Sequence, residues 1–149
     1  MLSIYIKSAL IPFFLLAFGT AVASADVIAD RKAKMKSVGK AVGSVARMAK
    51  GATEFDGDAA LAAFVSMKEA ARDFSELFPE GTETGGKTEA GPAIFSDRAG
   101  FEAKNKEFIA ALEMVINAGA PADLNALRGA LGQVGANCKA CHQTYRAKN

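Results

Sequence analysis

Apolar residues recur every three or four positions along most of the chain, which is the spacing of a helix with one buried face. The first such stretch spans residues 26–51, and its repeating positions are Val27 or Ile28, Met35, Val38, Val42, Val45 and Ala49. Stretches 58–78, 92–119 and 123–148 show the same spacing. Alanine is abundant, and valine and isoleucine are sparse outside the first 25 residues, so a sheet protein is disfavoured. The pattern predicts an all-α chain.

Residues that favour helix ends mark where these stretches begin. Asp26, Asp58 and Asp123 each precede an apolar stretch, and an aspartate side chain accepts hydrogen bonds from the free N–H groups of a first helical turn. The polar, glycine-rich run 79–92 is a predicted surface loop. The other two connections are short, which predicts antiparallel neighbours. We therefore expect an up-down-up-down four-helix bundle.

The first 25 residues differ in composition from the rest of the chain. Lys7 is their one charge, an apolar stretch covers residues 9–22, and the small residues Ala-Ser-Ala follow at 23–25. This order is typical of a secretory signal peptide over residues 1–25, cleaved to leave a single domain over 26–149 in the periplasm. The alternative is an uncleaved membrane anchor, because the apolar run and its flanks approach the ~20 residues that span a bilayer. After cleavage we expect no stable membrane insertion.

Charge is close to balanced, with 18 basic and 16 acidic residues and a formal net charge of +2. The charges are scattered and form no basic arm or stripe, which disfavours nucleic acid as a partner. The balance also predicts no strong electrostatic preference among protein partners. A length of 149 residues with 50% hydrophobic residues suits one domain that buries a core.

Both cysteines and the only histidine of the chain lie in one short stretch, CKACH at residues 138–142. On a helix, Cys138, Cys141 and His142 lie on one side, because residues three and four apart are neighbours. Cys-x-x-Cys-His is the attachment signature of c-type haem: the thiols bond to the haem, and the histidine becomes an axial ligand of its iron. A disulfide and a zinc site are the alternatives. No βαβ pattern surrounds the motif, and zinc would need a fourth ligand.

The second axial ligand of the iron decides whether such a protein carries electrons or binds gases. No second histidine exists, and methionine is the usual ligand in electron carriers, which leaves Met35, Met48, Met67 and Met114 after cleavage. At a rise of 1.5 Å per residue, His142 and Met35 both lie within roughly 12 Å of one end of the bundle, and the other three lie roughly 15 to 30 Å away. Met35 is therefore the candidate distal ligand, and the others are predicted core residues.

Aromatic residues are predicted to gather at the same end of the bundle, namely Phe74, Phe78, Phe95 and Phe101. Such a cluster forms a packed core in any case. Beside a porphyrin it also excludes water and raises the reduction potential.

With Cys-x-x-Cys-His near the C-terminal end of a four-helix bundle, the chain resembles the class II cytochromes c, the cytochrome c′ family. It is most similar to the low-spin members of the cytochrome c-556 type. The resemblance covers nearly all of residues 26–149. It implies that Met35, four residues after Arg31, lies over the distal face of the haem. It further implies that Arg31 pairs with a haem propionate and that Arg146 lies near the proximal imidazole.

The resemblance implies a periplasmic electron-transfer protein, not an enzyme, that carries one covalent haem c with His142 and Met35 as axial ligands of the iron. Its partners would be redox proteins. The alternative is uptake of nitric oxide or carbon monoxide at a five-coordinate haem, as in family members with an apolar residue at the distal position. A peroxidase is disfavoured because no distal histidine is available as an acid or base. Family members also dimerise through the first two helices, and the sequence leaves that arrangement open.

Overall fold

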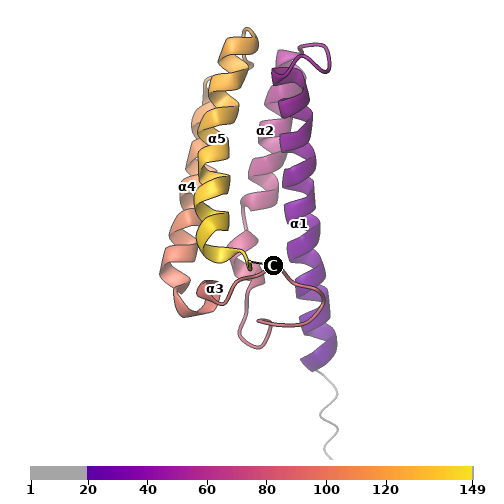
Figure 1. Ribbon diagram of the computed structural model, residues 1–149, viewed down its shortest axis with the longest axis vertical. Coiled ribbons are helices and arrows are strands. Elements are labelled where there is room, and N and C mark those ends of the chain that lie inside the picture. The colour runs from indigo at the N-terminus through magenta and orange to yellow at the C-terminus, as the bar shows by residue number, and fades with distance from the viewer. Residues whose placement is uncertain (1–19, 149) are drawn as a thin grey trace, which may run out of the picture.

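The computed structural model describes the backbone of residues 20–148 and the side chains of residues 26–148. Four long helices make up its body: α1 (Thr20–Ala49), α2 (Gly57–Ala71), α4 (Arg98–Asn117) and α5 (Leu124–Tyr145) (Figure 1). Two short helices lie between α2 and α4, the 3-10 helix η1 (Phe74–Leu77) and α3 (Ala93–Ser96). Within residues 20–148 the only extended pairing is an isolated bridge between Ala90 and Arg146. The predicted all-α fold is confirmed.

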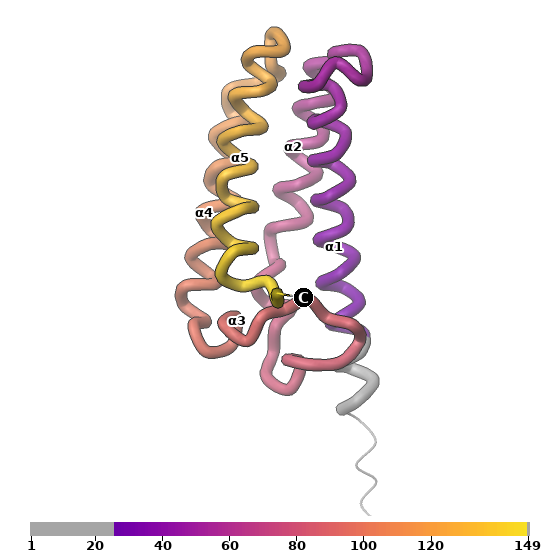
Figure 2. The backbone as a smooth tube through the Cα atoms, viewed as in Figure 1, coloured from indigo at the N-terminus to yellow at the C-terminus, as the bar shows by residue number. Residues whose placement is uncertain are grey.

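The long helices form a closed four-helix bundle. Helix α1 packs beside α2 and α5, and α4 packs beside the same two helices. Short turns join α1 to α2 and α4 to α5 at the upper end in Figure 1, so both pairs are antiparallel, as the tube in Figure 2 traces. The lower end gathers the start of α1, the end of α5, η1, α3 and the loop that precedes α3 (Figure 1). The predicted up-down-up-down arrangement is confirmed.

The middle of the bundle is filled by apolar side chains from all four long helices. The largest fully buried ones there are Val45, Phe64, Met67, Leu112, Leu127 and Val134. Met48 and Met67 are core residues, as predicted. The prediction is wrong for Met114, which is 57% exposed. It lies between the buried positions 112 and 115 of α4 but is turned out of the core, since successive helical residues are 100° apart, and its sulfur lies 3.9 Å from Gln133 Nε2 on α5.

The predicted helix starts are correct at one aspartate and wrong at two. Asp123 caps α5, and its side chain accepts hydrogen bonds from the N–H groups of Asn125 and Ala126 at 2.8 Å. Asp26 lies inside α1, because three of the six helical residues that precede it are alanines, which favour continuation of a helix. Helix α2 is capped by Asp56 instead of Asp58, which falls in the first turn.

The predicted signal peptide, 1–25, lies largely outside the described residues, which begin at 20. Its last six residues are the first residues of α1. None of the described helices combines the length and the apolar character that a membrane crossing requires.

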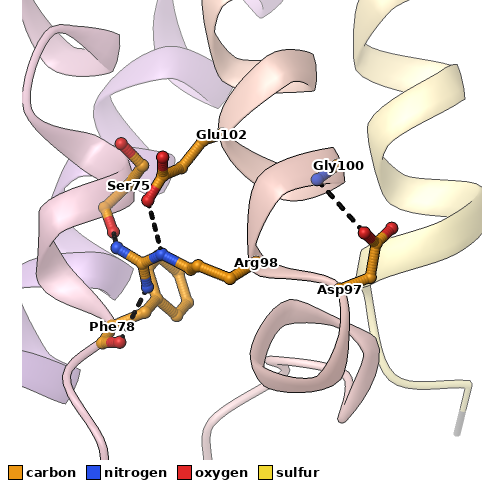
Figure 3. A network of polar contacts seen from close by, with 6 residues as sticks. All are labelled: Ser75, Phe78, Asp97, Arg98, Gly100 and Glu102. Carbon is orange, nitrogen blue, oxygen red and sulfur yellow. Dashed lines mark hydrogen bonds and ion pairs between the residues drawn. The ribbon is translucent and has the colours of Figure 1, made fainter.

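Two arginines hold the irregular segment between α2 and α3, and this explains the largest departures from the predicted helices. The predicted second helix ends at Ala71, and the predicted third helix is divided at Asp97. Arg98 donates to the carbonyl oxygens of Ser75 at 2.7 Å and Phe78 at 2.9 Å (Figure 3). Arg31 donates hydrogen bonds to the carbonyl oxygens of Leu77 and Thr82. Because these carbonyls have side-chain donors, the segment does not need to be helical to satisfy them.

Candidate haem site

A cavity of about 620 Å³ opens at the lower end of the bundle. Helix α1 lines it with Arg31 and Met35, and α5 lines it with Cys141, His142 and Tyr145. Between these helices the wall is apolar, formed by Phe74, Phe78, Ile94 and Phe101. The cavity therefore lies where the sequence predicted the aromatic cluster and the haem-attachment motif to meet.

The motif lies on the last turns of α5, which is one continuous helix to Tyr145. Both cysteines are half-buried free thiols, so the structure does not contain the disulfide alternative. Cys141 lines the cavity, and Cys138 lies one turn earlier, outside the lining. The Cys138 thiol lies 3.6 Å from the carbonyl oxygen of Val134. Across residues 20–148 no group of three or more His, Cys, Asp or Glu side chains is placed to hold a metal ion.

Burial shifts the pKa values of the three side chains of the motif. It raises the pKa of Cys138 and of Cys141, and for Cys141 the neighbouring Cys138 adds to the rise. Burial also lowers the pKa of His142, helped by the charge of Arg146 and opposed by Glu89. A lowered pKa favours the neutral imidazole, which is the form that binds a metal.

Met35 is the methionine that reaches this cavity. It lies one turn after Arg31 on α1 and is half-buried against the core. The cavity lining includes neither Met48, Met67 nor Met114. The structure thus brings Met35 and His142 to one cavity from neighbouring helices, which is the arrangement that the helical rise predicted. Ligation of iron by either residue stays a prediction.

Arg31 is the most buried charged side chain of the site, with 4% exposure. Its guanidinium donates to the carbonyl oxygens of Leu77 and Thr82 and to the Thr82 hydroxyl, and it stacks on the Phe78 ring with 4.1 Å to the ring centroid. Burial lowers its pKa, and Glu83 opposes that shift. Sequence reasoning assigned Arg31 to a propionate and missed these contacts, which join residues about 50 positions apart. A guanidinium has further N–H groups, so a propionate contact stays a prediction.

The end of α5 is fastened to α3 and α4 through Tyr145, a contact that sequence reasoning also missed. Its hydroxyl donates to the Asp97 carboxylate at 2.7 Å, and its ring packs 5.4 Å from that of Phe101. The hydrogen bond to Asp97 raises the pKa of Tyr145 to about 12. Gly91 donates to the Tyr145 carbonyl at 2.8 Å. Arg146 follows directly, exposed, and forms an ion pair with Glu89 at 2.7 Å.

The residues of this cavity fit a covalent haem. A flat, largely apolar ring suits a cavity of this size walled by phenyl groups. Free thiols three residues apart on one helix provide two attachment points, and a neutral imidazole and a thioether provide a nitrogen and a sulfur ligand.

Comparison with known proteins identifies the class. The sequence model of the family described as Cytochrome C' matches residues 26–146. A cytochrome c-556 from Agrobacterium tumefaciens (strain B2A) is 39% identical over 124 residues, which cover 83% of this chain and 99% of the relative.

Solved structures agree with this assignment. A nitric oxide complex of a variant of cytochrome c prime from Alcaligenes xylosoxidans is 32% identical, with a TM-score of 0.73 over 84% of this chain and 97% of the other. A cytochrome c′ with ligand-controlled dimer dissociation is 26% identical, with a TM-score of 0.76 over 84% and 97%. The chain therefore belongs to the cytochrome c′ family of class II cytochromes, whose members carry covalent haem c with its iron.

Proposed function

We propose that the protein is a periplasmic one-electron carrier in which Cys138 and Cys141 hold the haem covalently and His142 and Met35 are the axial ligands of its iron. The observation that carries this proposal is that Met35 and His142 line one cavity from neighbouring helices. When bound, the haem supplies an Fe(III)/Fe(II) couple, and a thioether ligand favours the reduced state relative to a second nitrogen ligand.

The side chains around the cavity limit rearrangement between the two redox states. Cys138, Cys141 and His142 belong to one helix whose end is fixed by Tyr145. On the neighbouring helix α1, Arg31 fixes the backbone to Leu77 and Thr82, one turn before Met35. The phenyl rings exclude water from the cavity, which favours the less charged, reduced state. Two ligands held on separately fastened helices change little when one electron is added or removed.

The proposal assigns no catalytic activity. His142 is the only histidine of the chain and is the proposed iron ligand. An enzyme that activates peroxide would need a separate acid or base on the distal side, where this protein presents the thioether of Met35.

The proposal also includes export to the periplasm and assembly into a homodimer. The family match begins at residue 26, directly after the proposed signal peptide of residues 1–25, which supports cleavage there and a periplasmic location. The dimeric relative supports a homodimer as one arrangement of this protein, and we place its interface on α1 and α2. Val65 on α2 is an exposed apolar side chain, at 38%, that such an interface would cover.

Uptake of nitric oxide is the second candidate function, and the nitric oxide complex of the Alcaligenes relative favours it. In that case Met35 would stay off the iron or leave it readily, and the cavity beside α1 would receive the gas. The two candidates share the same attachment residues and differ in the role of Met35.

The visible spectrum of the haem-loaded protein, oxidised and reduced, with and without carbon monoxide, separates the two candidates. An electron carrier with His/Met ligation gives a low-spin spectrum, sharp bands on reduction and no response to the gas. A broad reduced spectrum that shifts at once with carbon monoxide would mean an open sixth position and would replace the first candidate by the second.

A further inference from the structure

The mouth of the haem cavity is surrounded by cations. Six exposed basic residues line the cavity and the shallow depression that adjoins it on the outer side of α5, and together we term them the basic rim: Lys32, Lys36, Lys87, Lys139, Arg146 and Lys148. The same two linings contain a single acidic residue, Glu89. The cations come from α1, from the loop before α3 and from the end of α5, which meet at the lower end of the bundle (Figure 1).

Little of this charge is neutralised locally. Among the described ion pairs, one involves the rim, that of Arg146 with Glu89. Lys32 donates to the carbonyl oxygen of Gly86 at 3.2 Å and keeps its charge. The rim cations outnumber Glu89 together with the pair of propionates that a haem carries. The rim therefore remains net positive when the cofactor is bound.

The near-balanced net charge conceals this distribution. The two linings hold the six rim cations, the buried Arg31 and Glu89, which leaves 11 of the 18 basic and 15 of the 16 acidic residues elsewhere. The residues outside the two linings are thus net negative, and the positive excess of the chain lies in the linings of the cavity and the depression. The sequence-based expectation of no electrostatic preference overlooked this separation, because residues far apart in sequence form the rim.

We propose that the basic rim is the docking surface for the redox partner, and that this partner is a protein with a carboxylate-rich surface around its own redox centre. The inference rests on the proposed electron-transfer function and names the class of its partner. On contact, one electron leaves Fe(II) here to give Fe(III) and reduces the partner's centre by one electron, or the reverse. Complementary charge at the exchange site speeds the encounter and orients it, which suits a small, transient interface.

The rim favours an acidic protein over an anionic membrane. Surfaces that bind anionic lipid place large apolar side chains among their cations. Of the described side chains, the exposed large hydrophobic ones are Val65 and Met114, and neither lines the cavity or the depression. A docking surface that presents cations without large apolar side chains suits a protein partner whose surface carboxylates stay hydrated.

The local field can be measured with two small oxidants of opposite charge. Reduced, haem-loaded protein is mixed in a stopped-flow instrument with ferricyanide, an anion, or with tris(phenanthroline)cobalt(III), a cation, at rising salt concentration. Between roughly 10 and 200 mM salt we expect the rate with ferricyanide to fall about tenfold and the rate with the cobalt complex to rise. Rates that do not respond to salt, or that respond with the opposite signs, would overturn the basic rim as the exchange site.

A matched pair of variants distinguishes the effect of the rim cations on the rate from the effect of net charge. The double variant Lys36→Gln/Lys139→Gln removes two rim cations, and Arg47→Gln/Lys50→Gln removes two exposed cations at the other end of the bundle. Both changes lower the formal charge by two. The rim variant should lose most of the salt dependence, and the control should keep it. Equal behaviour of the two variants would mean that net charge alone governs the rate, against the proposal.

Binding to an acidic polypeptide tests the partner class. Haem-loaded protein should bind poly-L-glutamate at low salt, and the rim variant should bind several-fold more weakly than the control variant. Binding to vesicles of phosphatidylglycerol in phosphatidylcholine without binding to poly-L-glutamate would overturn the acidic protein in favour of a membrane. The carbon monoxide spectrum tests the proposed function separately from the rim. An open sixth position would reject the electron carrier, but the salt dependence of the rates with the two small oxidants would still report the charge of the rim.

Discussion

Met35 is the residue that separates the two candidate functions, because it lines the haem cavity on the side of α1. Replacing Met35 with alanine removes the thioether, so we expect the low-spin spectrum to become high-spin and carbon monoxide to bind the reduced protein. Met48→Leu provides the control, since Met48 is a core residue outside the cavity and the change nearly conserves volume. If Met35→Ala keeps the wild-type spectrum, Met35 is not a ligand.

Thr82 is nearly as buried as Arg31, at 2% exposure, and its hydroxyl and carbonyl both accept from that arginine. Thr82→Val removes the hydroxyl, which leaves one buried guanidinium nitrogen without its partner and also breaks the hydrogen bond from Thr82 to the Pro79 carbonyl. We expect a loss of about 1 to 3 kcal/mol in the free energy of unfolding, measured with urea. Thr84→Val, at an exposed position of the same loop, should cost far less. Equal losses would show that the Arg31 contact contributes nothing specific.

At the scale of elements, the end of α5 and the start of α4 are joined through Tyr145 and Asp97. The neutral phenol is favoured in the folded protein, where its pKa is raised to about 12 from an ordinary value of 10.0. The contribution of this contact to stability is therefore complete below pH 10 and is lost as the pH rises toward 12.

Tyr145→Phe tests this contact. We expect the variant to be less stable than the wild type at pH 8, with the difference in urea midpoint shrinking as the pH rises from 10 to 12. Comparison of the two proteins at each pH removes the effect of other titrating groups. A difference that stays constant over that pH range would contradict the assigned role of the hydroxyl.

The elements also show what sequence can predict here. The order and direction of four helices followed from local periodicity, and the start of α5 followed from Asp123, whose contacts are all local. The end of α2 and the break at Asp97 could not be predicted from local periodicity. Arg98 and Arg31 stabilise the segment between them by contacts that join residues 20 to 51 positions apart. The site divides in the same way. The motif placed Cys141 and His142 at the cavity and the helical rise placed Met35 there, whereas the long-range contacts of Arg31 and Tyr145 and the gathering of the rim required the structure.

At the scale of the whole molecule, two apolar clusters fill different parts of the bundle. One lies in the middle of the four helices, and the other, built on Phe78, Ile94, Phe101 and Tyr145, lies against the cavity. The first is closed by protein alone, while the second borders a space of about 620 Å³ that a haem would fill. We therefore expect the two clusters to depend differently on the cofactor.

The variant Cys138→Ala/Cys141→Ala removes both attachment points, so its haem should be extractable with acidified acetone, whereas that of the wild type should not be. Without the cofactor, apolar surface around the cavity is exposed to water, which lowers Tm and local stability. We expect amide hydrogen exchange to quicken in η1, in α3 and at the end of α5, and to stay slow around Phe64 and Leu112. Circular dichroism should show most of the helix retained. Uniform loss of protection would instead mean that the haem organises the entire bundle and that the middle cluster cannot hold the four helices alone.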